Sequence, residues 1–174
     1  SLNERRKAET MSEKTQNETV VTLPSDTEVQ VERIFDAPRD LVWDCYTDET
    51  LVADWLGPRR LKMRIEKWDF RVGGEWHYFH IDEGGNEYEF FGEFREIEQP
   101  TKIVQTFNFV MEPQPPASID SVEFIELGDG RTKLVGSTTF ESKEQRDGMV
   151  QSGMEKGMSE SFEQLDEILD SRKG

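Results

Sequence analysis

The feature that most constrains the fold is a single amphipathic segment at the end of the chain. Within residues 143–172, apolar side chains recur at spacings of three and four, and this pattern predicts one continuous helix with one apolar face. The apolar positions are Met149, Val150, Met154, Met158, Phe162, Leu165, Ile168 and Leu169. A helix of this kind must cover an apolar face of another element, so the rest of the chain has to supply that face.

Strand-forming segments precede this helix and supply the surface that it would cover. Apolar and polar residues alternate, with the two-residue period of a strand, in residues 27–35, 61–68, 75–81, 87–98, 102–111, 120–127 and 132–140. Turn-forming residues separate them, as at Gly84 and Gly85 and at Gly128 and Gly130. Gly92, inside the longest segment, indicates a bulge or a bend.

Two short helices are predicted between the first two strands. Pro38 suits the start of one helix, and Asp48 suits the cap of a second helix that ends before Gly57 and Pro58. The order is therefore one strand, two short helices, about six antiparallel strands and one long helix. This order predicts an α+β fold with one curved antiparallel sheet of about six or seven strands, and it favours a cavity between the sheet and the long helix.

The two ends of the chain differ in composition. Residues 1–25 are polar and almost free of aromatic side chains, which predicts a disordered tail, with local strand pairing of residues 19–23 as an alternative. Residues 26–172 then form one domain of ordinary size.

The charge of the chain restricts its partners. There are 37 acidic and 21 basic side chains, and the net charge is −16. Such a protein repels phosphate backbones and anionic membranes, so we expect no nucleic-acid binding and no membrane insertion. No apolar run approaches the roughly 18 residues of a transmembrane helix, and no signal peptide is expected. The single cysteine, Cys45, cannot form an internal disulfide and is expected to be buried, which fits a cytoplasmic location.

Several motifs resemble a known superfamily. Residues 34–38, followed by Leu41, Val42 and Trp43, are similar to the opening of the helix-grip (SRPBCC/START-like) superfamily. This superfamily includes the steroidogenic-acute-regulatory-type lipid-transfer domains, the polyketide cyclases and the birch-pollen allergen. The resemblance runs from about residue 27 to residue 169. It implies a curved antiparallel sheet wrapped around a long C-terminal helix, with two short helices after the first strand.

Further motifs resemble one branch, the homologues of the activator of the 90-kDa heat-shock protein ATPase. They are Trp55-Leu56-Gly57-Pro58, residues 71–76 and residues 153–158. Members of this branch often carry Trp where this chain has Leu56 and Met158, in the region that the resemblance turns toward the cavity. The eukaryotic activator carries an additional N-terminal domain for chaperone binding, and we expect no counterpart of it here. The family name is therefore a poor guide to function.

Candidate ligand contacts come from aromatic and methionine side chains that this fold would turn inward. Trp76, Tyr78 and His80 share one face of their strand, and the resemblance places that face toward the helix. Tyr and His are the polar groups that would orient a ligand in an apolar cavity. The predicted ligand-binding residues are Trp55, Trp76, Tyr78, His80, Phe90, Phe107, Phe109, Phe124, Met154 and Met158. Each of them could equally be ordinary core.

Metal binding and catalysis find little support in the sequence. His77 and His80 point to opposite faces of one strand, and no Cys pair or carboxylate spacing suits zinc or calcium. No Gly-x-Ser-x-Gly motif is present, and no signature ties Cys45 to a histidine. We therefore expect no metal, no cofactor and no assigned catalytic residue, although an enzyme remains an open alternative.

These observations predict a cytoplasmic binding module, monomeric or weakly dimeric, that holds a small apolar or amphipathic ligand between sheet and helix. One alternative is a chaperone-associated stress-response protein that acts through its surface, which follows from the family resemblance alone. A second alternative is a cyclase-like or hydrolase-like enzyme.

Overall fold

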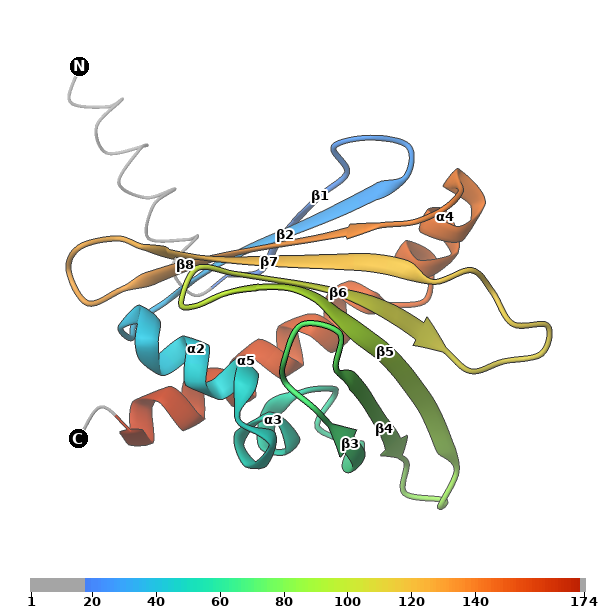
Figure 1. Ribbon diagram of the computed structural model, residues 1–174, viewed down its shortest axis with the longest axis horizontal. Helices are drawn as coiled ribbons and strands as arrows, with labels where there is room; N and C mark the ends of the chain where they lie inside the picture. Colours follow the sequence, from blue (N-terminus) through green and yellow to red (C-terminus); the bar gives the residue numbers. More distant parts are fainter. Residues whose placement is uncertain (1–17, 173–174) are drawn as a thin grey trace.

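The computed structural model describes residues 18–172 and is built on one antiparallel sheet of eight strands (Figure 1). The strands lie in the order β1-β2-β8-β7-β6-β5-β4-β3. Their bounds are β1 Val20–Thr22, β2 Glu28–Phe35, β3 Lys62–Trp68, β4 Glu75–Ile81, β5 Glu87–Glu98, β6 Lys102–Phe109, β7 Ser118–Glu126 and β8 Thr132–Thr139. Strands β3 to β8 form a meander, and β2 pairs with the last strand, β8. The predicted α+β fold is confirmed.

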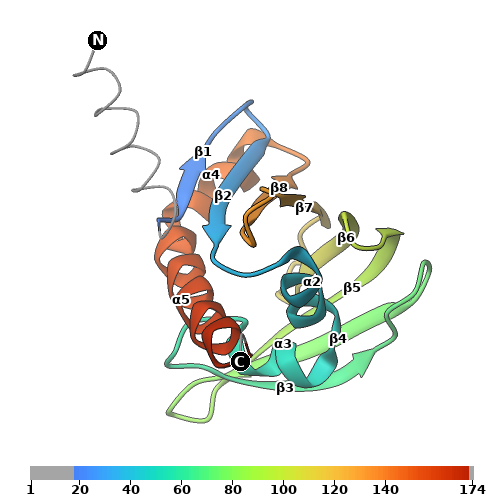
Figure 2. The same ribbon diagram turned by 90° about the vertical axis from the view of Figure 1, so that its left-hand side faces the viewer.

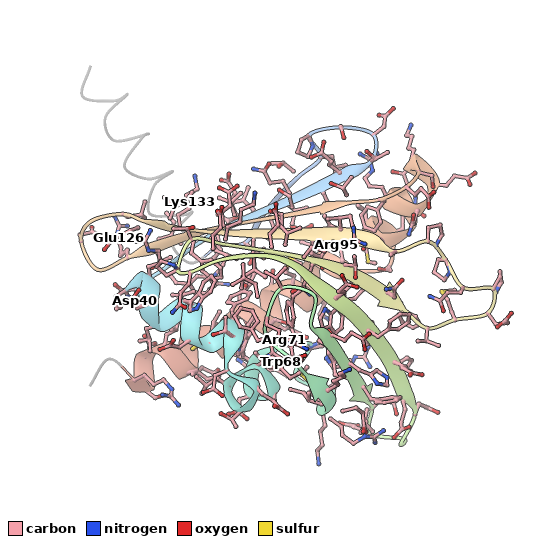
Figure 3. The ribbon with its side chains drawn as sticks, viewed as in Figure 1. Asp40, Trp68, Arg71, Arg95, Glu126 and Lys133 are labelled. Atoms are coloured by element: carbon pink, nitrogen blue, oxygen red, sulfur yellow. The ribbon has the colours of Figure 1, made fainter. Side chains whose placement is uncertain are left out.

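The sheet is curved and buries one face. In Figure 2 the strands curve from β1 around to β3, and helices α2 and α5 lie on the inner side of the curve. Alternate residues of β2 (Val29, Val31, Arg33 and Phe35) are buried, because successive side chains point to opposite faces. Charged side chains such as Lys133 project from the outer face (Figure 3). The inner face is therefore the one that can position a site.

Two short helices follow β2 as predicted. Helix α2 spans Arg39–Thr47 and α3 spans Glu49–Trp55. Pro38 stands at the N-cap of α2. The carboxylate of Asp48 caps α3 by accepting a hydrogen bond from the Thr50 amide at 2.9 Å. Both helices contact the last helix of the chain. They therefore lie on the inner side of the sheet.

The C-terminal segment consists of two helices, and the prediction of one continuous helix over residues 143–172 is wrong. Helix α4 spans Lys143–Gln151 and α5 spans Met154–Arg172. The chain breaks at Gly153, whose φ of +89° lies in the left-handed region that glycine adopts without strain. Met149 and Val150 therefore belong to a different helix from the apolar positions of α5.

Strand β1 lies within the predicted N-terminal tail. Val20, Val21 and Thr22 pair with β2, and Val21 packs against the core. Pairing satisfies the backbone groups of these residues, and the β-branched valines suit a strand. Residues 1–17 of the predicted tail lie outside the described residues. The division into a tail and a domain over residues 26–172 stays a prediction.

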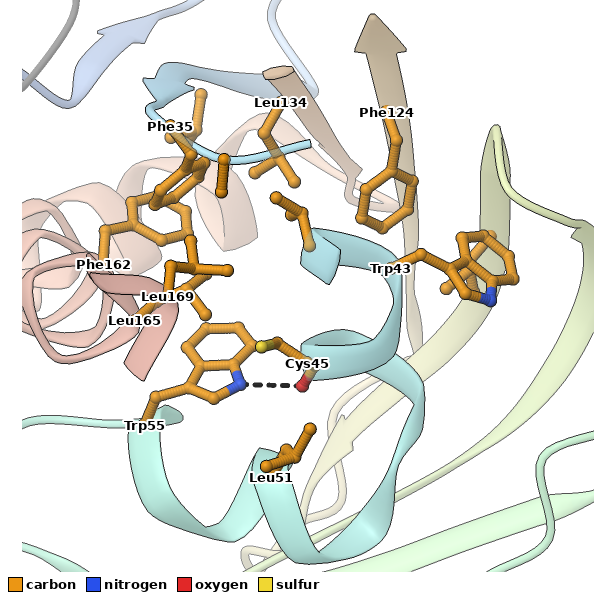
Figure 4. Close-up of a cluster of buried hydrophobic side chains, with 14 of the residues drawn as sticks. Phe35, Trp43, Cys45, Leu51, Trp55, Phe124, Leu134, Phe162, Leu165 and Leu169 are labelled. Atoms are coloured by element: carbon orange, nitrogen blue, oxygen red, sulfur yellow. Dashed lines mark hydrogen bonds between the residues drawn. The ribbon is translucent and has the colours of Figure 1, made fainter. Parts of the chain in front are cut away.

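The core joins the helices to the inner face of the sheet (Figure 4). Phe35 of β2 meets Phe162 of α5 edge to face, with ring centroids 5.4 Å apart. The indole of Trp55 donates a hydrogen bond to the Cys45 carbonyl at 2.8 Å, which joins α3 to α2. Cys45 is fully buried, as predicted. Trp55, Leu134 and Phe162 of this core also form part of the cavity described below.

Candidate functional site

A cavity of about 190 Å³ lies between the inner face of the sheet and the helices. The side chains and backbone that line it are Val31, Tyr46, Val52, Trp55, Leu56, Trp68, Trp76, Tyr78, Phe94, Ile103, Gln105, Phe107, Asp120, Ser121, Val122, Leu134, Gly136, Ser137, Thr138, Met158 and Phe162. Most of these groups are apolar or aromatic. For comparison, an engineered protein cavity of about 150 Å³ holds a benzene molecule.

Two glycines shape the walls of this cavity. Gly136 of β8 leaves the space open, because a Cβ there would meet nothing nearer than the Val31 carbonyl oxygen at 3.9 Å. Gly92 of β5 stands opposite Trp76, and a Cβ there would lie 2.6 Å from the indole. The missing side chain at Gly92 lets the indole lie flat against the sheet. Trp76 thus forms a wall of the cavity, stacked on Tyr78 with ring centroids 5.2 Å apart.

Three polar side chains form a row across the cavity floor. Gln105 of β6 stands opposite Asp120 of β7, and Asp120 stands opposite Thr138 of β8. Residues paired in this way point to the same face, and all three line the cavity. The row lies between the buried side chains of Phe94 and Val29, which are the next partners on either side. A polar row in an apolar wall is the arrangement that orients a bound molecule.

Asp120 is the charged member of this row. One of its oxygens accepts a hydrogen bond from the Thr138 hydroxyl at 2.8 Å. No other hydrogen bond or ion pair reaches its carboxylate from the described part of the chain. Burial raises the pKa of Asp120 to about 6, and the Thr138 hydrogen bond opposes the rise. The group is therefore mostly ionised at neutral pH, in a cavity with little else to stabilise its charge.

Tyr78 brings a hydroxyl to the same space. Burial raises the pKa of its phenol, and the nearby Asp120 carboxylate raises it further. The phenol is therefore neutral and can either donate or accept a hydrogen bond. Within residues 18–172, its oxygen has no protein partner. It is available to a molecule that enters the cavity.

The cavity gathers half of the predicted ligand-binding residues. Trp55, Trp76, Tyr78, Phe107 and Met158 all line it. They come from α3, β4, β6 and α5, so the sheet and the last helix both contribute.

Leu56 and Met158, the two positions at which the resemblance implies a frequent Trp, also line the cavity. Both side chains are smaller than an indole. These substitutions leave more space than tryptophans would.

His80 does not line the cavity. It is buried beside the loop after α3, where a Cβ on Gly57 would lie 2.7 Å from the imidazole. Burial lowers the pKa of His80 to about 4, and a hydrogen bond with the backbone of Leu56 partly opposes the shift. The amide of Gly57 in turn donates to the Ser161 hydroxyl at 2.7 Å, which fixes the loop to α5. His80 is therefore a neutral packing residue beneath the loop that supplies Leu56.

The other four predicted residues also lie outside the cavity lining. Phe124 is buried and meets Trp43 edge to face at 5.2 Å. Phe90 packs between neighbouring rings, including Phe109 at 5.0 Å. Met154 stands at the start of α5 and packs on the edge of the core. Phe90 also contacts the rings of Tyr78 and Phe107, which line the cavity.

Sequence reasoning missed the polar row. Gln105 has the same strand parity as Phe107, and Asp120 has the same parity as the buried Phe124. The parity was therefore a usable signal. The predicted strand began at Asp120, where a charged residue looks like an exposed end, whereas β7 begins at Ser118 and carries Asp120 into the sheet.

Other reactive groups lie away from the cavity. Burial raises the pKa of the Cys45 thiol to about 11, so it stays protonated at neutral pH and is a poor nucleophile. His77 contacts the Glu89 carboxylate at 2.7 Å. Within the described ranges, no three His, Cys, Asp or Glu side chains are grouped as metal ligands would be.

The helices of residues 18–172 are too short or too polar to span a membrane.

Comparison with known proteins places the chain. A family model described as "Activator of Hsp90 ATPase homolog 1-like protein" matches residues 36–170. The chain belongs to this family. The predicted resemblance is confirmed, and the match includes strands β3 to β8 and both short helices.

Solved structures of bacterial proteins share the fold. A protein from Arthrobacter aurescens, solved by solution NMR, is 28% identical with a TM-score of 0.79, over 87% of this chain and 91% of that one. A protein from Mycobacterium smegmatis is 25% identical with a TM-score of 0.79, over 88% of this chain and 99% of that one. One from Rhodobacter sphaeroides has a TM-score of 0.81 at 20% identity, over 88% and 99% of the two chains, and shows the fold alone. A search of curated proteins found no match.

Proposed function

We propose that this member of the family is a binding module for a small, largely apolar molecule that carries a polar group. The observation that carries the proposal is the cavity of about 190 Å³, where the Tyr78 hydroxyl, the Gln105 amide and the second carboxylate oxygen of Asp120 face a mainly apolar and aromatic wall. Polar groups left without partners in an apolar space cost free energy. A bound molecule that pairs with them removes that cost.

The cavity volume limits the size of the ligand. It is somewhat larger than a cavity that holds one benzene ring, so a single ring with a short substituent fits it. Aromatic walls at Trp76 and Phe107 offer flat surfaces for such a ring. Long lipid chains or sterols would need α5 to move away from the sheet.

A cytoplasmic location and a monomeric or weakly dimeric state complete the proposal. The single cysteine, Cys45, is buried and reduced, as is usual in a reducing compartment.

Titration of ¹⁵N-labelled protein with 2-phenylethanol tests the proposal. We expect amide shifts to concentrate at residues that line the cavity, such as Trp76, Gly136 and Met158. The variant Gly136→Val fills the space, because its side chain projects into the cavity from an open backbone position. It should therefore lose binding while its spectrum stays folded.

Thr139→Val is the matched control, since Thr139 is exposed on the same strand. It should bind as the natural chain does. Absence of shifts at the cavity, or shifts that persist in Gly136→Val, would contradict the proposal and favour the alternative in which the protein acts through its surface.

A further inference from the structure

We propose that the cavity selects ligands that carry a protonated amine, and that Asp120, with Gln105 and Tyr78, receives the ammonium group. This proposal rests on the proposed function and adds to it the chemical class of the ligand.

The charge of the Asp120 carboxylate is not balanced by a positive side chain in the cavity that the described residues form. Its carboxylate has one hydrogen bond, from Thr138, and its second oxygen has no protein partner among residues 18–172. No Lys, Arg or His belongs to the cavity lining formed by these residues. A carboxylate held in an apolar space without a counter-ion is costly, and the natural remedy is an opposite charge. The protein does not supply that charge, so the ligand is the remaining source.

The number of hydrogen-bond acceptors in the cavity matches the donors of an ammonium group. An ammonium group has three N–H donors and no acceptor. The cavity offers the free oxygen of Asp120, the amide oxygen of Gln105 and the hydroxyl oxygen of Tyr78. Gln105 stands directly opposite Asp120 in the sheet, and the charge of Asp120 acts on the phenol of Tyr78. All three acceptors therefore face the same cavity.

The aromatic wall of the cavity also favours a positively charged ligand. Trp76 lies 5.2 Å from Tyr78 and 5.8 Å from Phe107 between ring centroids. Faces of aromatic rings attract cations. The same wall gives no support to an anion, which the Asp120 carboxylate would also repel. Cationic ligands are thus favoured over neutral ones, and neutral ligands over anionic ones.

The titratable side chains that line the cavity agree with this assignment. They are Tyr46, Tyr78 and Asp120, and burial raises the pKa of both phenols, so the phenols carry no charge at neutral pH. Asp120 is the one group of the three that is ionised at pH 7.5. Binding of an amine should therefore weaken as the pH falls below about 6.

A matched set of four ligands tests the proposal at pH 7.5. The set is 2-phenylethylamine, 2-phenylethanol, propylbenzene and phenylacetate, which have nearly the same size and differ in charge. We expect the amine to bind at least about ten-fold more tightly than propylbenzene, the amount that about 1.4 kcal/mol of free energy produces. Phenylacetate should bind most weakly. Calorimetric titration measures all four affinities.

The variant Asp120→Asn keeps the shape of the side chain and can still accept the Thr138 hydrogen bond. It should remove the preference for the amine and leave propylbenzene binding unchanged or improved. Glu123→Gln is the control, because Glu123 is exposed on the same strand and its loss changes the net charge equally. That variant should keep the preference for the amine.

The outcomes separate the two proposals. If propylbenzene and the alcohol bind while the amine binds no more tightly, the amine proposal is overturned and the binding-module proposal stands. An amine preference that survives in Asp120→Asn overturns the amine proposal as well. If none of the four ligands binds in the cavity, both proposals fail.

Discussion

Asp120 links the cavity to the stability of the protein. When folding raises the pKa of an acid, the folded state is favoured at low pH. This advantage is lost as the pH rises through the pKa of the folded state. For Asp120, whose pKa rises from 3.8 to about 6, the loss occurs between these two values. The shift corresponds to about 3 kcal/mol in the free energy of unfolding.

Asp120→Asn should therefore stabilise the unliganded protein above pH 6. We expect a gain of about 2–3 kcal/mol at pH 7.5 and little change at pH 4, since the natural carboxyl is already mostly protonated there. Urea unfolding of both proteins across this pH range measures the difference. A variant that is less stable at pH 7.5 would show that the Asp120 charge is already compensated.

His80 should act in the opposite direction. Folding lowers its pKa from 6.5 to about 4. Between these two pH values the unfolded chain binds a proton at His80 that the folded chain does not bind. The protein should lose about 3 kcal/mol of stability as the pH falls through this range. Imidazole NMR signals provide the measurement, with His77→Gln to assign the two rings. A His80 signal that titrates above pH 6 would contradict this account.

At the scale of single residues, strand parity predicted which aromatic side chains face inward but not which of them reach empty space. Trp76, Tyr78 and His80 share a face. His80 is nevertheless enclosed by the loop at Gly57, which comes from a distant part of the sequence. Contacts of this kind depend on tertiary packing, and residue spacing carries no information about them.

Two strand glycines should respond differently to a methyl group. At Gly92 a Cβ would lie 2.1 Å from the Thr106 carbonyl oxygen and 2.6 Å from the Trp76 indole, whereas at Gly136 its nearest neighbour would be the Val31 carbonyl oxygen at 3.9 Å. Gly92→Ala should destabilise the protein by at least about 2 kcal/mol, and Gly136→Ala should be neutral or slightly stabilising. Thermal unfolding compares the two. Equal effects would contradict the close approach of Trp76.

The helical glycines give a second matched pair. Gly148 lies within α4, and a Cβ there meets nothing within 4 Å, so Gly148→Ala should stabilise by roughly 0.5–1 kcal/mol. Gly153 has a φ of +89°, so Gly153→Ala should destabilise by about 1 kcal/mol. Both changes can be read from denaturant midpoints. A stabilising Gly153→Ala would indicate one continuous helix.

At the scale of elements, the sequence predicted the order of strands and helices well, because their apolar periods differ. The break between α4 and α5 was missed. The spacing of apolar residues continues across Gly153 without interruption. The positive φ of that glycine therefore could not be predicted from the spacing. The bulge expected at Gly92 lies instead between Phe94 and Glu96, where the register of β5 against β6 shifts. Gly92 itself makes room for Trp76, which stands opposite on the neighbouring strand.

At the scale of the whole molecule, the net charge of −16 gains a role. A strongly negative protein attracts cations from a distance and raises their local concentration, so it favours approach of an amine. The same charge gives no indication of where an amine would bind. The cavity volume could not be predicted from the sequence either, because it depends on the distance between α5 and the sheet.

The most direct test of the central claim is a crystal structure of the protein with 2-phenylethylamine. The account predicts the ring against Trp76 and Phe107, with the nitrogen within hydrogen-bond distance of the Asp120 carboxylate. A structure in which α5 closes onto the sheet and side chains fill the cavity, with the amine absent from it, would contradict the claim.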